Sequence, residues 1–172
     1  MLTGLLRKKM FHVRQTQPDD VPQMLQEYRK YLDTGISEDR IRFLVSNFPS
    51  YCIIHESGNI IGFTYCGRST PDILELCNIF VAQSYQCMGL GTELLKRTLL
   101  GAKEAGYLAV ILSNSRLYHT KTKKPDPTNF YLRLGFSEVF STTGSKIFAA
   151  HLYEIESINS SLGKAYDCLI EA

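Results

Sequence analysis

Apolar positions along this chain follow two periods, and the way these periods alternate predicts a mixed α/β domain. Short runs rich in β-branched and aromatic residues predict strands, whereas apolar positions three and four residues apart predict helices. Polar turns separate these elements, such as residues 57–59, which predict the turn of a hairpin. The expected strands cover residues 11–16, 51–56, 60–66, 74–81, 107–112, 135–141 and 147–153.

Three helical patterns carry an apolar stripe on one face. The first begins at Pro18, with a proline and two acids in its first turn, and breaks at residues 33–35. The second begins at Ser37, the third runs from Thr92 to about Gly106, and a short fourth helix precedes the last two strands. The stripes consist of Val21, Met24, Leu25, Tyr28 and Leu32, then Ile41, Leu44 and Val45, then Leu94, Leu95, Thr98, Leu99 and Ala102. The predicted order of elements is therefore βααβββαβαββ.

The alternating elements occupy residues 10–155, which we expect to form one domain. A chain of 172 residues with 44% hydrophobic and 21% charged residues suits a single globular domain with its own core. Residues 1–9 predict either a basic arm or an upstream start. Residues 156–172 form a weakly amphipathic tail with helical spacing, which either packs on the domain or supports a homodimer.

Charge, cysteines and histidines narrow the range of partners. The 19 Lys and Arg residues against 17 Asp and Glu give a net charge of +2, so no global field favours nucleic acid or an anionic membrane. Because no apolar run approaches ~20 residues and the start is unlike a signal peptide, we expect a cytoplasmic protein. Five cysteines and four histidines show no metal-ligand spacing, which predicts reduced core cysteines and no metal.

The most specific chemical signal lies between the strand at residues 74–81 and the helix that starts at Thr92. Residues 86–92, Gln-Cys-Met-Gly-Leu-Gly-Thr, form a glycine-rich turn that opens a helix directly after a strand. Backbone N–H groups at a helix start lack intrahelical partners, and the helix dipole adds partial positive charge there. An anion therefore binds without a lysine, and glycine lets the chain approach it closely.

The spacing of the turn indicates which phosphate site it is similar to. It lacks the Gly-Lys-Ser/Thr of a P-loop and the third glycine of a dinucleotide turn. Its Gln-x-x-Gly-x-Gly order resembles the pyrophosphate loop of the GNAT acyltransferases, which hold acetyl-CoA. Residues 129–136, Asn-Phe-Tyr-Leu-Arg-Leu-Gly-Phe, resemble the Phe-Tyr-x-x-x-Gly-Phe signature of the same superfamily. The two stretches occur in the family's order, and the resemblance covers residues 11–153.

The resemblance implies a single GNAT-type acyl-CoA N-acyltransferase domain, with a mixed, mostly antiparallel sheet flanked by helices. It also implies direct transfer of an acetyl group from the cosubstrate acetyl-CoA to a primary amine in a ternary complex. Backbone groups of Ile79, Phe80 and Val81 would hold the pantetheine arm and polarise the thioester. The pyrophosphate would rest on the backbone N–H groups of Gln86, Cys87, Met88, Gly89, Leu90, Gly91 and Thr92.

Two side chains match positions at which the family places proton transfer. Glu75 lies six residues before Val81, where histone-acetylating members carry their general base. The alternative is an edge glutamate that faces solvent or pairs with an arginine such as Arg68. Tyr131 corresponds to the general acid that protonates the departing CoA thiolate, and the alternative there is a packed aromatic side chain.

Three departures from the family pattern bear on the site. Cys87 stands where many members have glycine, so the loop is either stiffer and oxidisable or the thiol is inert. Lys124 and Pro127 stand where many members have asparagine and alanine. The long polar insertion that carries the lysines at 121, 123 and 124 would either meet an anionic group of a substrate or form a solvated loop.

The acceptor and the rival functions remain open from sequence alone. The family selects its acceptor with the first two helices and their loop, where acidic and aromatic residues suit a small-molecule or peptide amine that is cationic. These residues are Glu27, Tyr28, Tyr31, Asp33, Glu38 and Asp39. The alternative function is a sensor or assembly module that binds acetyl-CoA without turnover and needs neither Glu75 nor Tyr131. A nucleotide phosphate in the glycine loop is a third interpretation.

Overall fold

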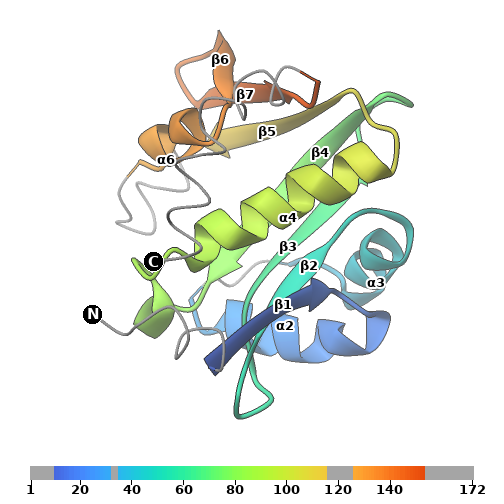
Figure 1. Cartoon of the computed structure of the whole chain (residues 1–172), viewed down its shortest axis with the longest axis vertical. Helices are drawn as coiled ribbons and strands as arrows, with labels where there is room; N and C mark the ends of the chain where they lie inside the picture. Colours follow the sequence, from blue (N-terminus) through green and yellow to red (C-terminus); the bar gives the residue numbers. More distant parts are fainter. Residues whose placement is uncertain (1–9, 32–34, 116–125, 154–172) are drawn as a thin grey trace.

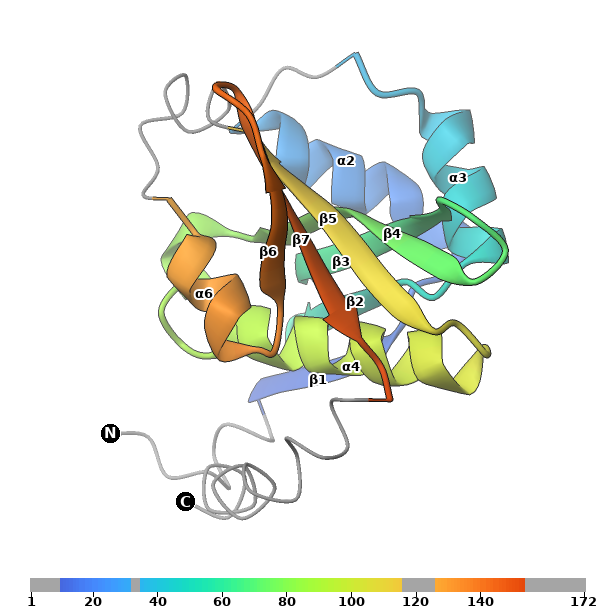
Figure 2. The same ribbon diagram turned by 90° about the horizontal axis from the view of Figure 1, so that it is seen from above.

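The computed structural model describes residues 10–31, 35–115 and 126–153, which form one seven-stranded sheet with helices on both faces (Figure 1). The elements are β1 (Phe11–Gln15), η1 (Pro18–Asp20), α2 (Val21–Arg29), α3 (Glu38–Asn47), β2 (Tyr51–His55), β3 (Ile60–Arg68), β4 (Ile73–Val81), η2 (Gln83–Tyr85), α4 (Leu90–Glu104), β5 (Ala109–Ser115), α6 (Thr128–Arg133), β6 (Ser137–Ser141) and β7 (Ser145–His151). Helices α2 and α3 cover one face of the sheet, and α4 crosses the other (Figure 2).

The sheet has the strand order β1-β2-β3-β4-β5-β7-β6. Among the described strands, β4 and β5 form a parallel pair and the other neighbours are antiparallel. The order βααβββαβαββ and the mixed, mostly antiparallel sheet are therefore confirmed. The expected basic arm at residues 1–9, the lysines at 121, 123 and 124, and the tail at residues 156–172 lie outside the described ranges.

The first expected helix is divided into a 3-10 turn that starts at Pro18 and a helix that starts at Val21. The Arg14 guanidinium stabilises this turn by donating to both carboxylate oxygens of Asp20, at 2.6 and 2.8 Å. The Gln17 N–H donates to Asp20 Oδ2 at 2.7 Å. These hydrogen bonds, the one from Arg14 first, hold the pKa of Asp20 below its ordinary value.

The third expected helix begins two residues earlier than the sequence pattern predicts. Helix α4 begins at Leu90 rather than at Thr92. Gly89 is the N-cap with a left-handed φ of 78°, and its carbonyl already accepts the N–H of Glu93 at 3.1 Å. The glycine therefore turns the chain directly into the helix, and the whole first helical turn belongs to the glycine-rich segment.

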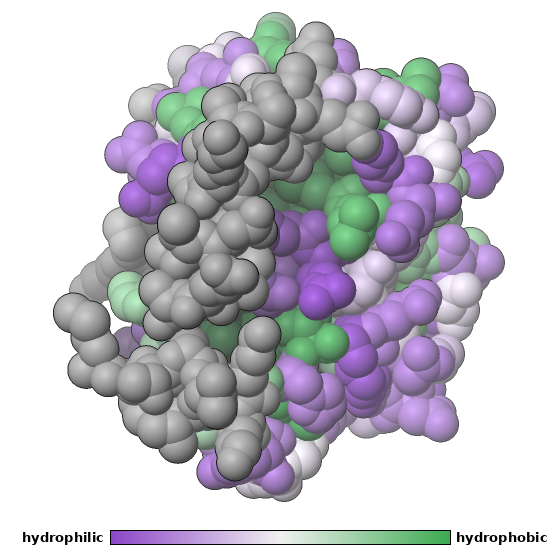
Figure 3. Space-filling model, in the orientation of Figure 1, coloured by the Kyte–Doolittle hydropathy of each residue, from purple (hydrophilic) through white to green (hydrophobic). Residues whose placement is uncertain are grey.

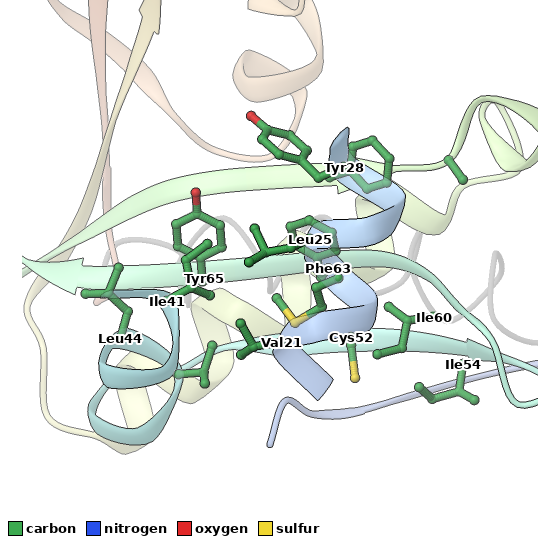
Figure 4. Close-up of a cluster of buried hydrophobic side chains, with 14 residues drawn as sticks. Val21, Leu25, Tyr28, Ile41, Leu44, Cys52, Ile54, Ile60, Phe63 and Tyr65 are labelled. Carbon is green, nitrogen blue, oxygen red and sulfur yellow. The ribbon is translucent and has the colours of Figure 1, made fainter. Parts of the chain in front are cut away.

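The sheet divides the hydrophobic core into two halves. Every described residue of the three predicted helical stripes is buried. Side chains of α2 and α3 pack against β2 and β3, where Phe63 is 1% exposed (Figure 4). On the opposite face, α4 packs against the sheet through residues such as Leu95. The buried hydroxyls of Thr64 and Thr98 join β3 to α4 through a 2.8 Å hydrogen bond, so neither polar group is left unsatisfied.

Strands β4 and β5 pair over a short distance and then separate. Their parallel register ends at the pair Glu75 and Ile111. The register of β4 with β3 shifts at Cys77, which opposes no residue of β3 and is therefore the extra residue of a β-bulge. A bulge bends and twists its strand. Beyond it β4 stays with β3 while β5 follows β7, which leaves a wedge between the two strands.

The face that α4 presents is mostly hydrophilic, with smaller hydrophobic patches (Figure 3). In the part of the chain that the structure describes, no helix combines the length and the apolar character needed to cross a bilayer. The same residues hold no group of three or more His, Cys, Asp or Glu that is placed to bind a metal ion. Cys52 and Cys66 are buried free thiols in strands, as predicted, but Cys77 and Cys87 are exposed because they occupy the bulge and the loop.

The substitution Asp20→Asn is expected to lower the free energy of unfolding by about 1 kcal/mol at pH 7. This is less than a charged hydrogen bond usually contributes, because the Arg14 side chain is 39% exposed and solvent screens the pair. Since the folded-state pKa of Asp20 is lowered, the contribution is complete above the ordinary aspartate pKa of ~3.9 and is lost as the pH falls through the folded-state value. Urea denaturation at a series of pH values measures it. Asp19→Asn is the control, since that carboxylate is fully exposed, and an equal effect there would contradict the assignment.

Candidate active site

A cavity of about 500 Å³ occupies the wedge between β4 and β5. Besides Tyr28 of α2 and Gln86 and Gly91 of the glycine-rich segment, it is lined by Leu76, Cys77, Asn78, Ile79, Phe80 and Val81 of β4, Leu112, Ser113, Asn114 and Ser115 of β5, and Pro127, Phe130 and Tyr131 at α6. None of these described lining residues carries a formal charge. An anionic ligand would therefore be held here by backbone groups and neutral side chains.

The backbone of β4 directs polar groups into this wedge. Ala82 N–H donates across to Ile61 O of β3 at 2.8 Å. Since these groups alternate along an antiparallel strand, the N–H and C=O groups of Val81 and Ile79 point away from β3, to the side that β5 has left. The Gln86 amide donates to Val81 O at 2.9 Å, which satisfies one of them. The predicted positions Ile79 and Val81 thus present backbone groups to the cavity, while Phe80 packs on the α2 side.

The glycine-rich segment places a helix start beside the cavity. In α4, the first helical N–H with an intrahelical partner is that of Glu93, so the N–H groups of residues 90–92 precede the bonded part of the helix. A Cβ built on Gly91 would lie 3.6 Å from Phe130 and 3.9 Å from Val81, which are ordinary contact distances. The protein itself therefore does not require a glycine at position 91. The residue leaves room on the cavity side.

The other side chains of this segment have structural roles or face solvent. Leu90 is buried and Met88 is half-buried, and both pack on the cluster around β1 and β2. Thr92 is half-buried in the first turn of α4. Cys87 is exposed and has a φ of 61°, in the left-handed region that favours glycine. Cys87, which stands where many family members have glycine, therefore strains the backbone of the loop.

Tyr131 lines the cavity and is held by the way α6 ends. Gly135 follows the helix with a φ of 87°, and its N–H donates to Leu132 O at 3.2 Å. The Phe136 N–H donates to Tyr131 O at 3.2 Å, and the two rings pack 5.9 Å apart. This pattern is a Schellman motif with its hydrophobic contact. The motif explains why β6 begins at Ser137, two residues later than the predicted start at Gly135. It also explains why the signature includes Gly-Phe after Tyr131.

The ring of Tyr131 is also part of the core. It is 8% exposed and lies 5.3 Å from the ring of Phe130 and 5.8 Å from that of Phe148. The two interpretations from sequence, a packed aromatic and a site residue, therefore apply together. Packing fixes the direction of the phenol with respect to the wedge.

Asp126 joins the start of α6 to β5, a contact that sequence reasoning missed. Its Oδ1 accepts from the Thr128 hydroxyl at 2.7 Å, from the Thr128 N–H at 2.9 Å and from Asn114 Nδ2 at 3.0 Å. These bonds, those from Thr128 first, hold the pKa of Asp126 below its ordinary value. An Asp two residues before a helix is a capping signal, but its link to Asn114 depends on β5 lying alongside.

Three polar side chains form a hydrogen-bonded cluster on the α2 side of the wedge. Asn78 Nδ2 donates to the hydroxyl of Tyr28 at 2.9 Å and lies 3.4 Å from the hydroxyl of Tyr65. Burial raises the pKa of Tyr65 to about 12, so its phenol is neutral at physiological pH. In Figure 4 both phenol oxygens point away from the core cluster. A signal existed in the sequence, because Asn78 and Glu75 are the two polar residues of a largely apolar strand.

Glu75 occupies the point at which β4 and β5 separate. It is half-buried in a central strand, so the alternative of an edge position is wrong, and within the described residues it forms no ion pair with Arg68. It does not line the cavity. The neighbouring Cys77 does, and its Sγ lies 3.7 Å from Glu75 O. Although Cys77 is exposed as a residue, surrounding protein atoms desolvate its thiol, which together with the Glu75 carboxylate raises its pKa to about 11.

Solved structures of similar fold include acetyltransferases with their cosubstrate. The PaiA N-acetyltransferase from Thermoplasma acidophilum in complex with coenzyme A is 15% identical, with a TM-score of 0.66 over 82% of this chain and 98% of that chain. The putative acetyltransferase YncA from Salmonella typhimurium with acetyl-CoA is 16% identical, with a TM-score of 0.63 over 83% and 94%. The ribosomal-protein-S18-alanine N-acetyltransferase from Escherichia coli is 19% identical, with a TM-score of 0.66 over 83% and 94%.

The structural similarity shows a common fold, and a comparison of the sequence with family models identifies the family. No curated protein matches the chain in sequence. The family model described as acetyltransferase (GNAT) domain matches residues 48–138, which is more than half of the chain. The matched segment contains the bulge of β4, the glycine-rich segment and all of α6. The chain therefore belongs to the GNAT acetyltransferase family.

Proposed function

We propose that this protein transfers an acetyl group from acetyl-CoA to a primary amine by direct attack in a ternary complex. One observation carries the proposal. A single cavity connects an uncharged helix-start anion site, a stretch of β4 with free backbone polar groups and the tyrosine of α6. The coenzyme A and acetyl-CoA complexes named among the similar structures support this donor.

The donor would be held by the backbone. The Gln86 N–H already donates to Gln83 O at 3.3 Å, so the N–H groups of residues 87–92 receive the pyrophosphate. The space beside Gly91 lets the phosphate approach them. From Val81 to Cys77, β4 extends for four residues, or roughly 13 Å at about 3.3 Å per residue, which suits an extended pantetheine arm. Its free backbone groups at Ile79 bind that arm and stabilise negative charge on the thioester oxygen.

The proton transfers would be divided between Tyr131 and Glu75. As the amine nitrogen bonds to the carbonyl carbon and the C–S bond breaks, Tyr131 donates a proton to the departing thiolate from the α6 side of the cavity. The acylated nitrogen then releases its surplus proton, which restores the Tyr131 phenol. Glu75 receives the proton that the acceptor ammonium must lose before attack. Because Glu75 does not line the cavity, this transfer runs through a bridging water instead of direct contact.

The Gly91→Ala substitution tests the pyrophosphate site. An added Cβ meets no protein atom closer than 3.6 Å, and alanine favours a helix over glycine, so the free energy of unfolding should be unchanged or slightly higher. The KM for acetyl-CoA should rise about tenfold or more, the loss of one charge-assisted hydrogen bond. Gly144→Ala, which has open space around its Cβ, is the control and should leave KM unchanged. Unaltered donor kinetics in Gly91→Ala would place the phosphate elsewhere.

The Tyr131→Phe substitution separates an enzyme from a binding module. We expect kcat to fall by roughly 10²- to 10⁴-fold because the acid is lost, with acetyl-CoA affinity unchanged because the ring still packs. The readout is thiol release with a panel of amines, and Tyr153→Phe, an exposed tyrosine, is the control. If the native protein releases no thiol with any amine while acetyl-CoA still raises its Tm, the alternative of an acetyl-CoA sensor or assembly module holds instead.

The Glu75→Gln substitution tests the base through its pH dependence. At neutral pH kcat/KM for the amine should fall by roughly 10²-fold or more. The deficit should narrow as the pH approaches the acceptor pKa near ~10, since the amine then arrives already deprotonated. A purely structural effect would stay constant with pH. Glu56→Gln, at an exposed position after β2, is the matched control.

A further inference from the structure

A second cavity, of about 350 Å³, lies on the α2 and α3 side of β4, next to the bulge. Cys77 lines both cavities, and Tyr65, which lines the second, lies 3.4 Å from the amide of Asn78 in the first. The two spaces therefore flank the same point of β4, where the bulge opens the wedge. A molecule in the second cavity would have one end at the place where an acetyl group is expected.

The walls of the second cavity differ in chemistry. Ile36, Ile41 and Leu44 make one side apolar, and Figure 4 shows Ile41 and Leu44 on α3 near Tyr65 on β3. Gly35, Ser37, Arg40, Tyr65 and Cys77 complete the lining. Arg40 is the one charged residue among these described lining residues. Its positive charge has the smallest effect on the pKa values of Tyr65 and Cys77 and acts against the burial that raises them.

Arg40 is exposed and forms no ion pair within the described part of the chain, whereas the neighbouring Arg42 donates to Glu38 at 2.8 Å. Glu27 is likewise paired, with Lys30. Among the described residues that line the two cavities, none is acidic. The expectation that acids of this region would attract a cationic amine is therefore not supported by the described lining of the second cavity, whose one charged residue is the cation Arg40.

We propose that the second cavity binds the carboxylate and the side chain of a free amino acid that serves as the acetyl acceptor. This inference rests on the proposed function. The guanidinium of Arg40 pairs with the carboxylate through its fork of N–H donors, and the apolar wall takes an aliphatic side chain. The amino group then lies toward Cys77 and the wedge. A volume of about 350 Å³ suits a small molecule better than a protein segment.

Paired acceptors test this assignment. Leucine and 3-methylbutylamine share an aliphatic chain and an amine and differ in the carboxylate. Arg40→Met should lower kcat/KM for leucine by about tenfold to a hundredfold, the usual effect of losing a charged hydrogen bond, and leave 3-methylbutylamine within about twofold. For each acceptor, the variant is compared with the native protein, so differences in reactivity between the two amines do not affect the result. Arg29→Met, an exposed arginine on α2 that lines neither cavity, should change neither acceptor.

A binding measurement separates this proposal from the proposed function. Calorimetric titration of leucine into the protein with bound coenzyme A should give affinity that Arg40→Met lowers at least tenfold. Arg40-dependent binding of leucine, with no turnover of leucine or of any amine in the panel, would support the carboxylate site and overturn the proposed acetyl transfer. Equal losses for both acceptors in Arg40→Met, or turnover of 3-methylbutylamine alone, would overturn the carboxylate site and leave the acetyltransferase assignment in place.

Discussion

The site depends on a central strand, β4, that keeps its hydrogen bonds to β3 but loses those to β5 partway along its length. Cys77 adds one residue to β4, the strand bends, and the parallel pairing with β5 ends at Glu75. Buried backbone N–H and C=O groups require partners, so the free side of β4 beyond Cys77 is a binding surface by construction. The Gln86 side chain satisfies Val81 O, and the groups at Ile79 remain for a ligand. The cavity and its polarity both follow from this one interruption.

Local motifs complete the walls around the wedge. The start of α4 supplies N–H groups because Gly89 turns the chain into the helix, and the end of α6 fixes Tyr131 because Gly135 and Phe136 close a Schellman motif. Asp126 ties the start of α6 to β5. The helix start at Gly89 and the Schellman motif at Gly135 both involve residues that are close in sequence. Their residues therefore form recognisable signatures in the sequence. The motifs are local, but they act together only across the wedge.

The bulge also explains why two cavities with different chemistry lie side by side. The wedge is lined by uncharged groups and suits an anion held by backbone donors, whereas the α2 and α3 side carries a guanidinium at Arg40 over an apolar floor. Cys77 belongs to both because a bulged residue is released from the alternation of the strand. Its thiol has a raised pKa, so at neutral pH it remains a neutral wall group between the two spaces.

Sequence alone determined the order of elements, the helical stripes, the glycine-rich helix start within residues 86–92 and the place of Tyr131 on a short helix, because periodicity, capping and glycine conformations are properties of neighbouring residues. Tertiary structure decided the rest. The bulge at Cys77, the group formed by Asn78 with Tyr28 and Tyr65, the link from Asp126 to Asn114 and the turning of Arg40 toward a cavity all join segments far apart in the chain. Such contacts depend on strand register and helix packing, which no local pattern encodes.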